Sequence, residues 1–150
     1  MDVGGATRWT MDKVVSMEEI LARAAAAYGD PEPVDSQRTS APADRFRLPS
    51  GQTFGVIAST TRPFCAGCDR ARVTADGKFF SCLYALEGTR LLDALRGGGP
   101  EAAAKIVAEL WRGRDDRGAE ERLAAESRGA LAVAEELKGK PHLEMHTRGG

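Results

Sequence analysis

The positions of apolar and polar residues predict a helix near the start of the chain. The apolar residues that would share one helical face are Ile20, Leu21, Ala24 and Tyr28. Ser16 and Glu19 form a capping-box pattern ahead of this stripe, and Gly29 can end the helix. Residues 30–43 are rich in Pro, Ser, Thr and Asp, so they predict a loop after the helix.

Short runs of β-branched and aromatic residues predict strands in the middle of the chain, at residues 45–48, 53–59, 72–74 and 79–83. The dipeptide Asp76-Gly77 separates the last two runs, which is a strong signal for a β-hairpin.

Helical patterns return in the second half of the chain. A short helix is expected from about residue 90, and the run Gly97-Gly98-Gly99-Pro100 should break it. A second amphipathic pattern follows the break, carried by Ile106, Val107, Leu110 and Trp111. Residues 119–138 are rich in Ala, Glu, Leu and Arg and predict a further helix with a weak apolar stripe. The chain therefore predicts strands and helices in one region spanning residues 1–150.

Composition narrows the function classes. The 150 residues are 42% apolar and 29% charged, with a net charge of −1, as in a soluble globular protein. This charge gives no overall attraction to nucleic acid or to an anionic membrane. The sequence shows neither an apolar run of membrane-spanning length nor a secretory signal, so it predicts a cytoplasmic protein.

Three cysteines form the candidate chemical site. Cys65, Cys68 and Cys82 follow the spacing C-x2-C-x13-C, and an odd number of cysteines without a secretory signal favours metal binding over disulfides. A C-x2-C pair lets two thiolates converge on a metal or cluster, and the Asp76-Gly77 turn brings the third cysteine back toward them. Three thiolates suit a 4Fe–4S cluster that leaves one iron open to a substrate ligand.

Other interpretations of the cysteines stay open at this point. They could be separate buried apolar residues, or zinc ligands completed by His142 or His146. Such a zinc site would make the chain a small interaction domain without catalysis. A thioredoxin-like redox pair is less favoured, because its C-x2-C would open a helix, whereas residues 72–74 predict a strand.

Two arginines lie between the second and third cysteines. Arg70 and Arg72 carry forked donors that suit a phosphate or the edge of a guanine base. They could also be solvated charges on a strand, which is the usual environment of an arginine. Their position between two candidate cluster ligands favours a binding role.

The sequence resembles the GTP 3′,8-cyclases, which are radical S-adenosylmethionine enzymes of molybdenum cofactor biosynthesis. The resemblance is carried by Thr53-Phe54-Gly55-Val56-Ile57-Ala58-Ser59, by Phe64-Cys65-Ala66-Gly67-Cys68-Asp69-Arg70-Ala71-Arg72, and by Asp76-Gly77-Lys78 with Cys82-Leu83. Weaker similarity lies in Met1-Asp2-Val3-Gly4-Gly5, in Trp111 with Arg114-Asp115-Asp116-Arg117 and Glu121-Arg122, and in the final Gly149-Gly150.

The resemblance implies a fold, two cofactors and a set of site residues. The fold would be the C-terminal part of an incomplete α/β barrel, with antiparallel strands and helices that read as α+β on their own. Cys65, Cys68 and Cys82 would hold a 4Fe–4S cluster that binds GTP. Arg70, Ala71 and Arg72 would contact GTP, Met1 would line the S-adenosylmethionine site, and the tail residues Gly149 and Gly150 would reach into the active site. A homodimer stays open.

One departure from the family is plain. The motif C-x3-C-x2-C, which in the family holds the cluster that cleaves S-adenosylmethionine, is absent from these 150 residues. We therefore expect the N-terminal radical-forming half to be missing, and the chain alone not to turn over GTP. We also expect Phe46, Phe54, Val56 and the neighbouring helix to present apolar surface that absent barrel strands would otherwise cover, with poor solubility or partial disorder as the result.

The resemblance also selects between two registers of the predicted hairpin. A bulged turn with Gly77 in the left-handed conformation would pair Thr74 with Lys78, Arg72 with Phe80, and Arg70 with Cys82. Both arginines would then lie on the cluster side, because alternate residues of a strand share a face. A two-residue turn would shift the register by one and send both arginines away. We expect the bulged register.

Overall fold

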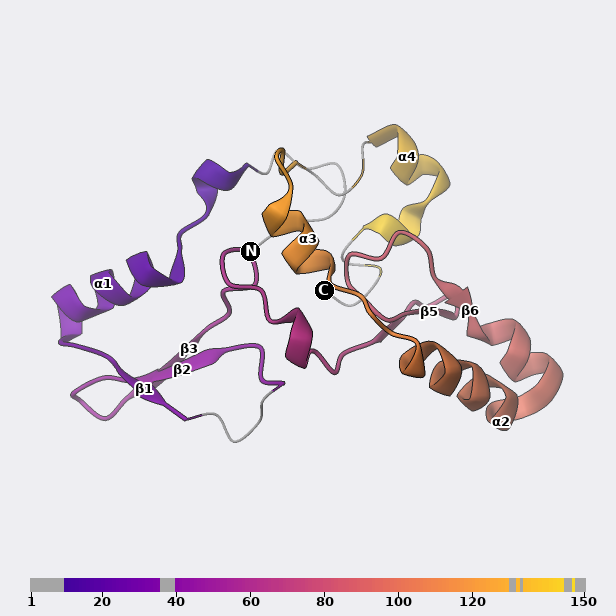
Figure 1. Cartoon of the computed structure of the whole chain (residues 1–150), viewed down its shortest axis with the longest axis horizontal. Coiled ribbons are helices and arrows are strands. Elements are labelled where there is room, and N and C mark those ends of the chain that lie inside the picture. The colour runs from indigo at the N-terminus through magenta and orange to yellow at the C-terminus, as the bar shows by residue number, and fades with distance from the viewer. Residues whose placement is uncertain (1–9, 36–39, 130–131, 133, 145–146, 148–150) are drawn as a thin grey trace.

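The computed structural model describes residues 10–35, 40–129, 132, 134–144 and 147. In this part of the chain the fold is α+β, with two antiparallel three-stranded sheets and four α-helices (Figure 1). The predicted class of antiparallel strands with helices is confirmed. Three short 3-10 helices also occur among the described residues: η1 (Met11–Lys13), η2 (Cys65–Gly67) and η3 (Pro141–Leu143).

Helix α1 (Met17–Tyr28) lies where the sequence predicts it. The backbone N–H of Glu19 donates to Oγ of Ser16 at 3.2 Å, so the serine caps the first turn. Gly29 follows the last turn, and its N–H donates to the carbonyl of Ala25 at 2.9 Å. The local capping signals were sufficient to predict both ends of this helix.

The first sheet contains three antiparallel strands in the order β1 (Glu32–Val34), β2 (Asp44–Arg47) and β3 (Thr53–Val56). Strand β2 lies one residue before the predicted run 45–48, and β3 confirms the start of the predicted run 53–59 but ends earlier. Strand β1 was not predicted, and the expected loop over residues 30–43 is wrong there. Pro33 has no N–H to donate, but an edge strand tolerates proline because one side of it is unpaired.

Helix α1 and the first sheet bury a small core between them. Met17, Phe46 and Val56 are buried, and the partly buried side chains packed against them are Ile20, Leu21, Phe54 and Ala58. The rings of Phe46 and Phe54 stack with centroids 5.7 Å apart. The expectation of uncovered apolar surface is therefore wrong for Phe46 and Val56, which α1 covers, while Phe54 is half-buried. On the neighbouring helix α1, Tyr28 is exposed. The other exposed large apolar side chains of the described residues are Met11, Val15, Ile57, Val73, Leu86, Leu95, Trp111 and Leu123.

The second sheet has the strand order β4 (Arg72–Val73), β5 (Lys78–Phe80) and β6 (Thr89–Arg90), all antiparallel. Arg72 pairs with Phe80, and the N–H of Thr74 donates to the carbonyl of Lys78 at 2.9 Å. Gly77 has a φ of 78°, the left-handed conformation that glycine adopts at little cost. These contacts confirm the bulged register between β4 and β5.

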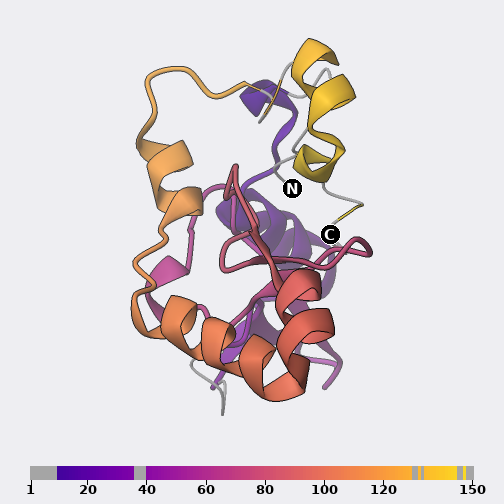
Figure 2. The same ribbon diagram turned by 90° about the vertical axis from the view of Figure 1, so that its right-hand side faces the viewer.

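Helix α2 (Leu91–Arg112) consists of two helical rods joined at Gly99, which has a φ of 75° and a ψ of −174°. Figure 2 shows the two rods meeting at an angle. The predicted break at the glycine run is confirmed.

Helices α3 (Gly118–Ala124) and α4 (Ala134–Gly139) follow, with non-helical residues 125–129 between them. The continuous helix predicted over residues 119–138 is therefore wrong, and Ser127 and Gly129, both poor helix formers, lie in the interruption.

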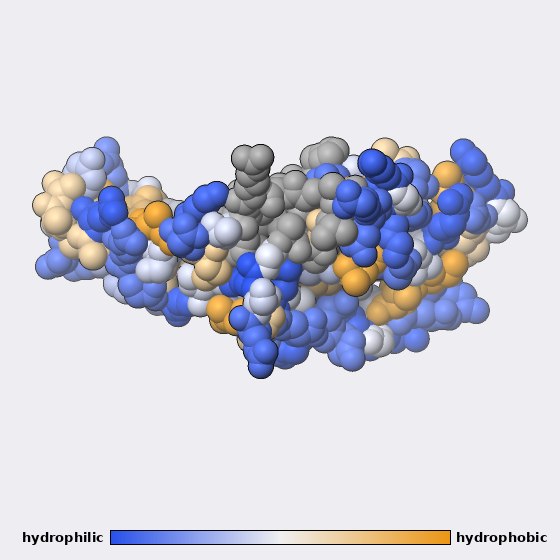
Figure 3. Space-filling model, turned by 90° about the horizontal axis from the view of Figure 1, so that it is seen from above, coloured by the Kyte–Doolittle hydropathy of each residue, from blue (hydrophilic) through white to orange (hydrophobic). Residues whose placement is uncertain are grey.

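The elements are arranged along one long axis. Helix α1 and the first sheet occupy one end, the second sheet and α2 occupy the other, and η2 and α3 lie between them (Figure 1). Seen from above, apolar side chains form small separate groups among hydrophilic ones (Figure 3). None of the helices in the described residues is long and apolar enough to span a membrane.

Candidate functional site

The C-x2-C pair lies in a tight turn between the two sheets. Cys65 opens η2, and the N–H of Cys68 closes the turn by donating to the carbonyl of Cys65 at 3.1 Å. Both thiols are free and half-buried. The turn thus presents two sulfur donors from four consecutive residues.

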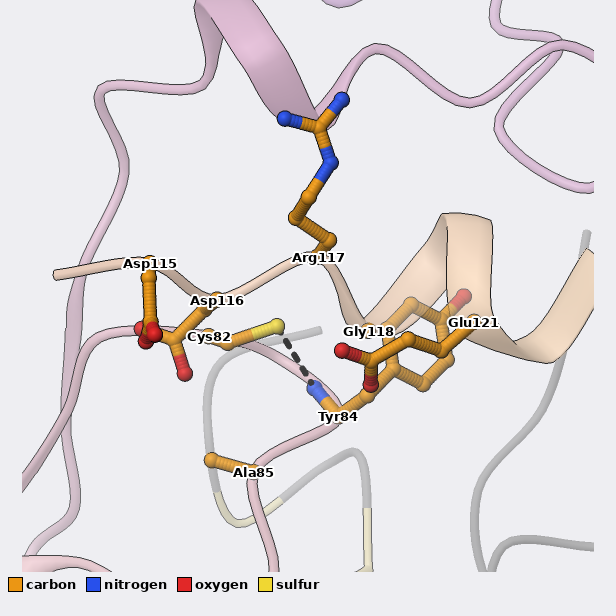
Figure 4. A pocket seen from close by; sticks show the side chains of 8 residues that line it. All are labelled: Cys82, Tyr84, Ala85, Asp115, Asp116, Arg117, Gly118 and Glu121. Atoms are coloured by element: carbon orange, nitrogen blue, oxygen red, sulfur yellow. Dashed lines mark hydrogen bonds between the residues drawn. The ribbon is translucent and has the colours of Figure 1, made fainter.

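Cys82 follows strand β5 and lies beside the start of α3. Its Sγ accepts a hydrogen bond from the backbone N–H of Tyr84 at 3.4 Å, drawn as the dashed line in Figure 4. A Cβ built on Gly118 would lie only 3.1 Å from this sulfur and 2.7 Å from Cβ of Tyr84. The absence of a side chain at Gly118 therefore lets α3 approach the third cysteine closely.

A pocket of about 190 Å³ opens next to Cys82. Its lining combines one thiol, three carboxylates and an aromatic ring: Cys82, Tyr84, Ala85, Asp115, Asp116, Arg117, Gly118 and Glu121. In Figure 4 the guanidinium of Arg117 extends away from Cys82 and the other labelled side chains. Arg117 is an exposed residue whose pKa is raised, first by a hydrogen bond from its guanidinium to Glu120 and then by the charge of that residue, with a smaller effect from Cys65.

Arg70 is fixed against the C-x2-C turn. Its guanidinium lies over the ring of Phe64, with Cζ 4.5 Å from the ring centroid, and its Nη2 is 3.6 Å from Sγ of Cys68. Its Nε is buried and has no hydrogen-bond partner among the described residues. A buried donor of this kind is costly unless something accepts from it, so Arg70 is suited to an additional acceptor.

Arg72 is half-buried on strand β4, two residues further on. Burial lowers the pKa of its guanidinium, and repulsion from Arg70 lowers it further, while Cys68, Cys82 and Tyr84 act in the opposite direction. Cys68 and Cys82 are thus close enough to affect the pKa of the Arg72 guanidinium. The intervening Ala71 is exposed.

The thiol of Cys68 is more acidic than an ordinary cysteine. Partial burial raises its pKa, but hydrogen bonds from the backbone and guanidinium of Arg70 and from the guanidinium of Arg114 outweigh that effect, and the net shift is downward. A lower pKa increases the fraction of thiolate, which is the form that binds metals.

Some predicted site residues lie outside the described part of the chain. These are Met1, Gly149 and Gly150, and also His146 of the zinc alternative; His142 lies in η3, but its side chain is outside the described part. Within the described residues, no three His, Cys, Asp or Glu side chains are grouped closely enough to hold one metal ion. The structure brings Arg70 to Cys68, and Arg72 into the electrostatic range of Cys68 and Cys82.

Sequence reasoning missed Arg114 as part of this site. Its Nη1 donates to the carbonyl of Cys68, although the two residues are 46 positions apart. In the sequence Arg114 stood out only as part of the charged run after Trp111 that resembles the family. No local pattern links that run to the cysteines, so the contact becomes visible only in the folded chain.

The fold and the site define an α+β protein region in which free thiols and arginines lie together. Residues 1–120 match the family described as Molybdenum Cofactor Synthesis C, and the chain belongs to that family. It is 52% identical over 154 residues to GTP 3′,8-cyclase 3 of Mycobacterium bovis, covering all of this chain and 40% of that protein.

Two further relatives bear related names. GTP 3′,8-cyclase 1 of Mycobacterium tuberculosis is 52% identical over 151 residues, covering all of this chain and 42% of that protein. GTP 3′,8-cyclase of Parasynechococcus marenigrum is 40% identical over 151 residues, again over all of this chain and 39% of that protein. The chain therefore spans about two fifths of the length of these curated relatives.

Proposed function

We propose that this chain is the GTP-binding part of a radical GTP 3′,8-cyclase in molybdenum cofactor biosynthesis. Cys65, Cys68 and Cys82 hold a 4Fe–4S cluster, and Arg70 and Arg72 hold GTP beside it. The observation that carries the proposal is the position of Arg70, whose guanidinium lies over Phe64 with Nη2 3.6 Å from Sγ of Cys68. Arg72 lies half-buried two residues further on. The names of the relatives support the same activity.

The donor set fits an iron–sulfur cluster. Three free, half-buried thiols provide the ligands that such clusters prefer, and the lowered pKa of Cys68 favours the thiolate. A four-iron cluster takes each thiolate on a different iron, so its ligands need not meet at one point. When bound, a cluster with three protein ligands supplies an open iron that can accept a donor atom from a purine.

The side chains around the thiols have distinct roles in binding GTP. The ring of Phe64 packs against the guanidinium of Arg70, and the Nε of Arg70, which has no hydrogen-bond partner among the described residues, would gain one from an acceptor on the nucleotide. Arg72 adds a second positive charge in a half-buried position, where an ionic hydrogen bond is stronger than in open solvent. By the family resemblance, Ala71, which is exposed between them, also contacts GTP.

The remaining roles belong to the whole enzyme. S-adenosylmethionine would be cleaved at another cluster, carried by a C-x3-C-x2-C segment that is absent from these 150 residues. Met1 would line the S-adenosylmethionine site, and Gly149 and Gly150 would reach the shared cavity. The reaction would convert GTP to its 3′,8-cyclised dihydro form.

Metal content and nucleotide binding test the proposal together. The chain is reconstituted anaerobically with iron and sulfide, separately loaded with zinc, and titrated with GTP. We expect about four irons per chain, broad visible absorption, and GTP binding that depends on the cluster. One tightly bound zinc, no iron uptake and no GTP binding would instead support a zinc-stabilised interaction domain.

A further inference from the structure

Arg114 connects the helical half of the chain to the C-x2-C turn. It lies between the end of α2 at Arg112 and the start of α3 at Gly118. Its Nη1 donates to the backbone carbonyl of Cys68, 46 positions earlier in the sequence. The guanidinium therefore holds a backbone atom of the same residue whose thiol is proposed as a cluster ligand.

The guanidinium is itself held firmly in place. Its Cζ lies 4.6 Å from the centroid of the Trp111 ring, and its Nε is 3.6 Å from Oδ2 of Asp116. Only 11% of the Arg114 side chain is exposed. These contacts to an aromatic face and a carboxylate leave the guanidinium little freedom to move away from Cys68. The donors of a guanidinium are also held in one plane, so binding a carbonyl costs little conformational entropy.

The backbone of the turn makes few hydrogen bonds in the described structure, although the Arg70 side chain also contacts the Cys68 sulfur. Cys68 N–H donates to the carbonyl of Cys65, and the ladder between β4 and β5 begins only at Arg72. The Cys68 carbonyl thus lies between the turn and the strand that carries Arg72. Anchoring this carbonyl restricts the backbone angles that determine where the Cys68 side chain points.

We propose that Arg114 is a positioning residue of the cysteine site: by holding the Cys68 carbonyl, it fixes the direction of the Cys68 thiolate and places a permanent positive charge beside it. This inference rests on the proposed cluster. Groups around first ligands orient them, and losing such a group commonly costs about 10–100-fold in metal affinity. Hydrogen bonds and charge near cluster sulfurs also set the reduction potential.

The test compares Arg114→Ala and Arg114→Lys with Arg112→Ala, a control at an exposed arginine in the last turn of α2. Each reconstituted chain is measured for iron loss to a chelator, for the reduction potential of its cluster, and for the electron paramagnetic resonance spectrum of the reduced cluster. Arg114→Ala should lose iron about tenfold faster or more, with a more negative potential and an altered spectrum. Arg114→Lys should keep the reduction potential close to the wild-type value but still lose iron faster. The reason is that lysine keeps the positive charge but lacks the planar set of donors that binds the carbonyl.

Hydrogen exchange of the iron-free chains separates this inference from the proposed function. Arg114→Ala should speed exchange of the Cys68 amide, and Arg112→Ala should not. A wild-type chain that takes up no iron would overturn the proposed function, and the exchange result would then decide whether Arg114 restrains the turn. Wild-type values of exchange, iron loss and potential in Arg114→Ala would overturn the inference, as would equal effects in Arg112→Ala.

Discussion

Arg70 and Arg72 are two residues apart but have different surroundings. The guanidinium of Arg70 lies over the Phe64 ring and reaches the Cys68 sulfur. Arg72 is half-buried on β4, and the thiols of Cys68 and Cys82 affect its pKa. The Phe64 ring restrains Arg70, whereas backbone pairing in β4 restrains Arg72. Their guanidinium groups repel each other, and an anion bound between them would relieve that repulsion.

We expect Arg70→Ala and Arg72→Ala each to weaken GTP binding to the reconstituted chain. Arg72→Ala should leave the iron content unchanged, whereas Arg70→Ala also removes a donor 3.6 Å from Sγ of Cys68 and should speed iron loss as well. A charge-assisted hydrogen bond contributes about 1.5–3 kcal/mol, so affinity should fall about tenfold to over a hundredfold. Isothermal titration with GTP measures this, with Arg96→Ala on the exposed face of α2 as the control. Unchanged affinity in both single variants would mean that these arginines are ordinary surface charges.

Cys82 is the cysteine furthest along the chain from the other two, so its variant tests the three-ligand site most directly. Cys82→Ser should sharply lower iron retention, because a hydroxyl is a poor ligand for this type of cluster. Iron and sulfide analysis after reconstitution measures the loss, and Ser81→Ala, a change at the neighbouring half-buried residue, serves as the control. Full iron retention in Cys82→Ser would count strongly against the site.

Some residues of the site could be predicted from the sequence and others could not. Cys65, Cys68, Cys82, Arg70 and Arg72 could be selected because they lie within one short segment with a recognisable spacing. Arg114 could not, because its contact to Cys68 depends on how α2 folds back along the molecule. Phe64 was visible only as a neighbour of the first cysteine, and its stacking with Arg70 required coordinates.

At the scale of elements, α3 is packed against Cys82 without a side chain in between. Gly118 begins α3, and a Cβ there would lie too close to Tyr84 and tight against the cysteine sulfur. Alanine favours a helix over glycine by about 1 kcal/mol, so helix propensity and packing act in opposite directions at this position.

At Gly118 we expect the cost of the steric clash to exceed the gain in helix propensity. Gly118→Ala should lower the free energy of unfolding by about 1–3 kcal/mol, since inserting a methyl into a filled contact forces neighbours to move. It should also reduce iron retention, because Cys82 is one of the groups displaced. Chemical denaturation and iron analysis measure both effects. Gly129→Ala, where a Cβ meets open space, is the matched control, and equal behaviour of the two variants would refute the expected clash.

Elements with local signals were predicted well and the others were not. Helix α1 has its cap and its terminating glycine within the sequence, and the hairpin of β4 and β5 has Asp76-Gly77 at its turn. Strand β1 was missed because its pairing with β2 outweighs the poor strand propensity of its proline. The gap between α3 and α4 was missed because an alanine-rich composition resembles a continuous helix.

For the whole molecule, the first core explains why one expectation was wrong. We expected Phe46 and Val56 to lack cover, because we assigned their cover to strands outside this chain. Instead they are 7% and 8% exposed, and α1 packs over them. A pattern of apolar residues predicts that a face is buried, but it does not identify the element that buries it.

The chain on its own should not turn over GTP. Its three cysteines are all assigned to one site, and these 150 residues contain no C-x3-C-x2-C motif for cleaving S-adenosylmethionine. The test is to incubate the reconstituted chain with reductant, S-adenosylmethionine and GTP, and to assay 5′-deoxyadenosine and cyclised nucleotide. Activity should appear only after adding a polypeptide that carries the motif. Either product above a protein-free control, without that polypeptide, would contradict the prediction.

The bulged hairpin has a consequence for how the gene can vary in length. Arg72 faces Phe80 because Thr74 pairs with Lys78 across the turn between β4 and β5. Losing the codon of Ala75 would leave Asp76-Gly77 as a two-residue turn that can keep this pairing. Losing the codon of Val73, inside β4, would instead place Arg72 opposite Phe79 and move its side chain to the other face, because strand side chains alternate with a period of two. Deleting Val73 should therefore abolish GTP binding, and deleting Ala75 should harm it less; the opposite ranking would refute this constraint.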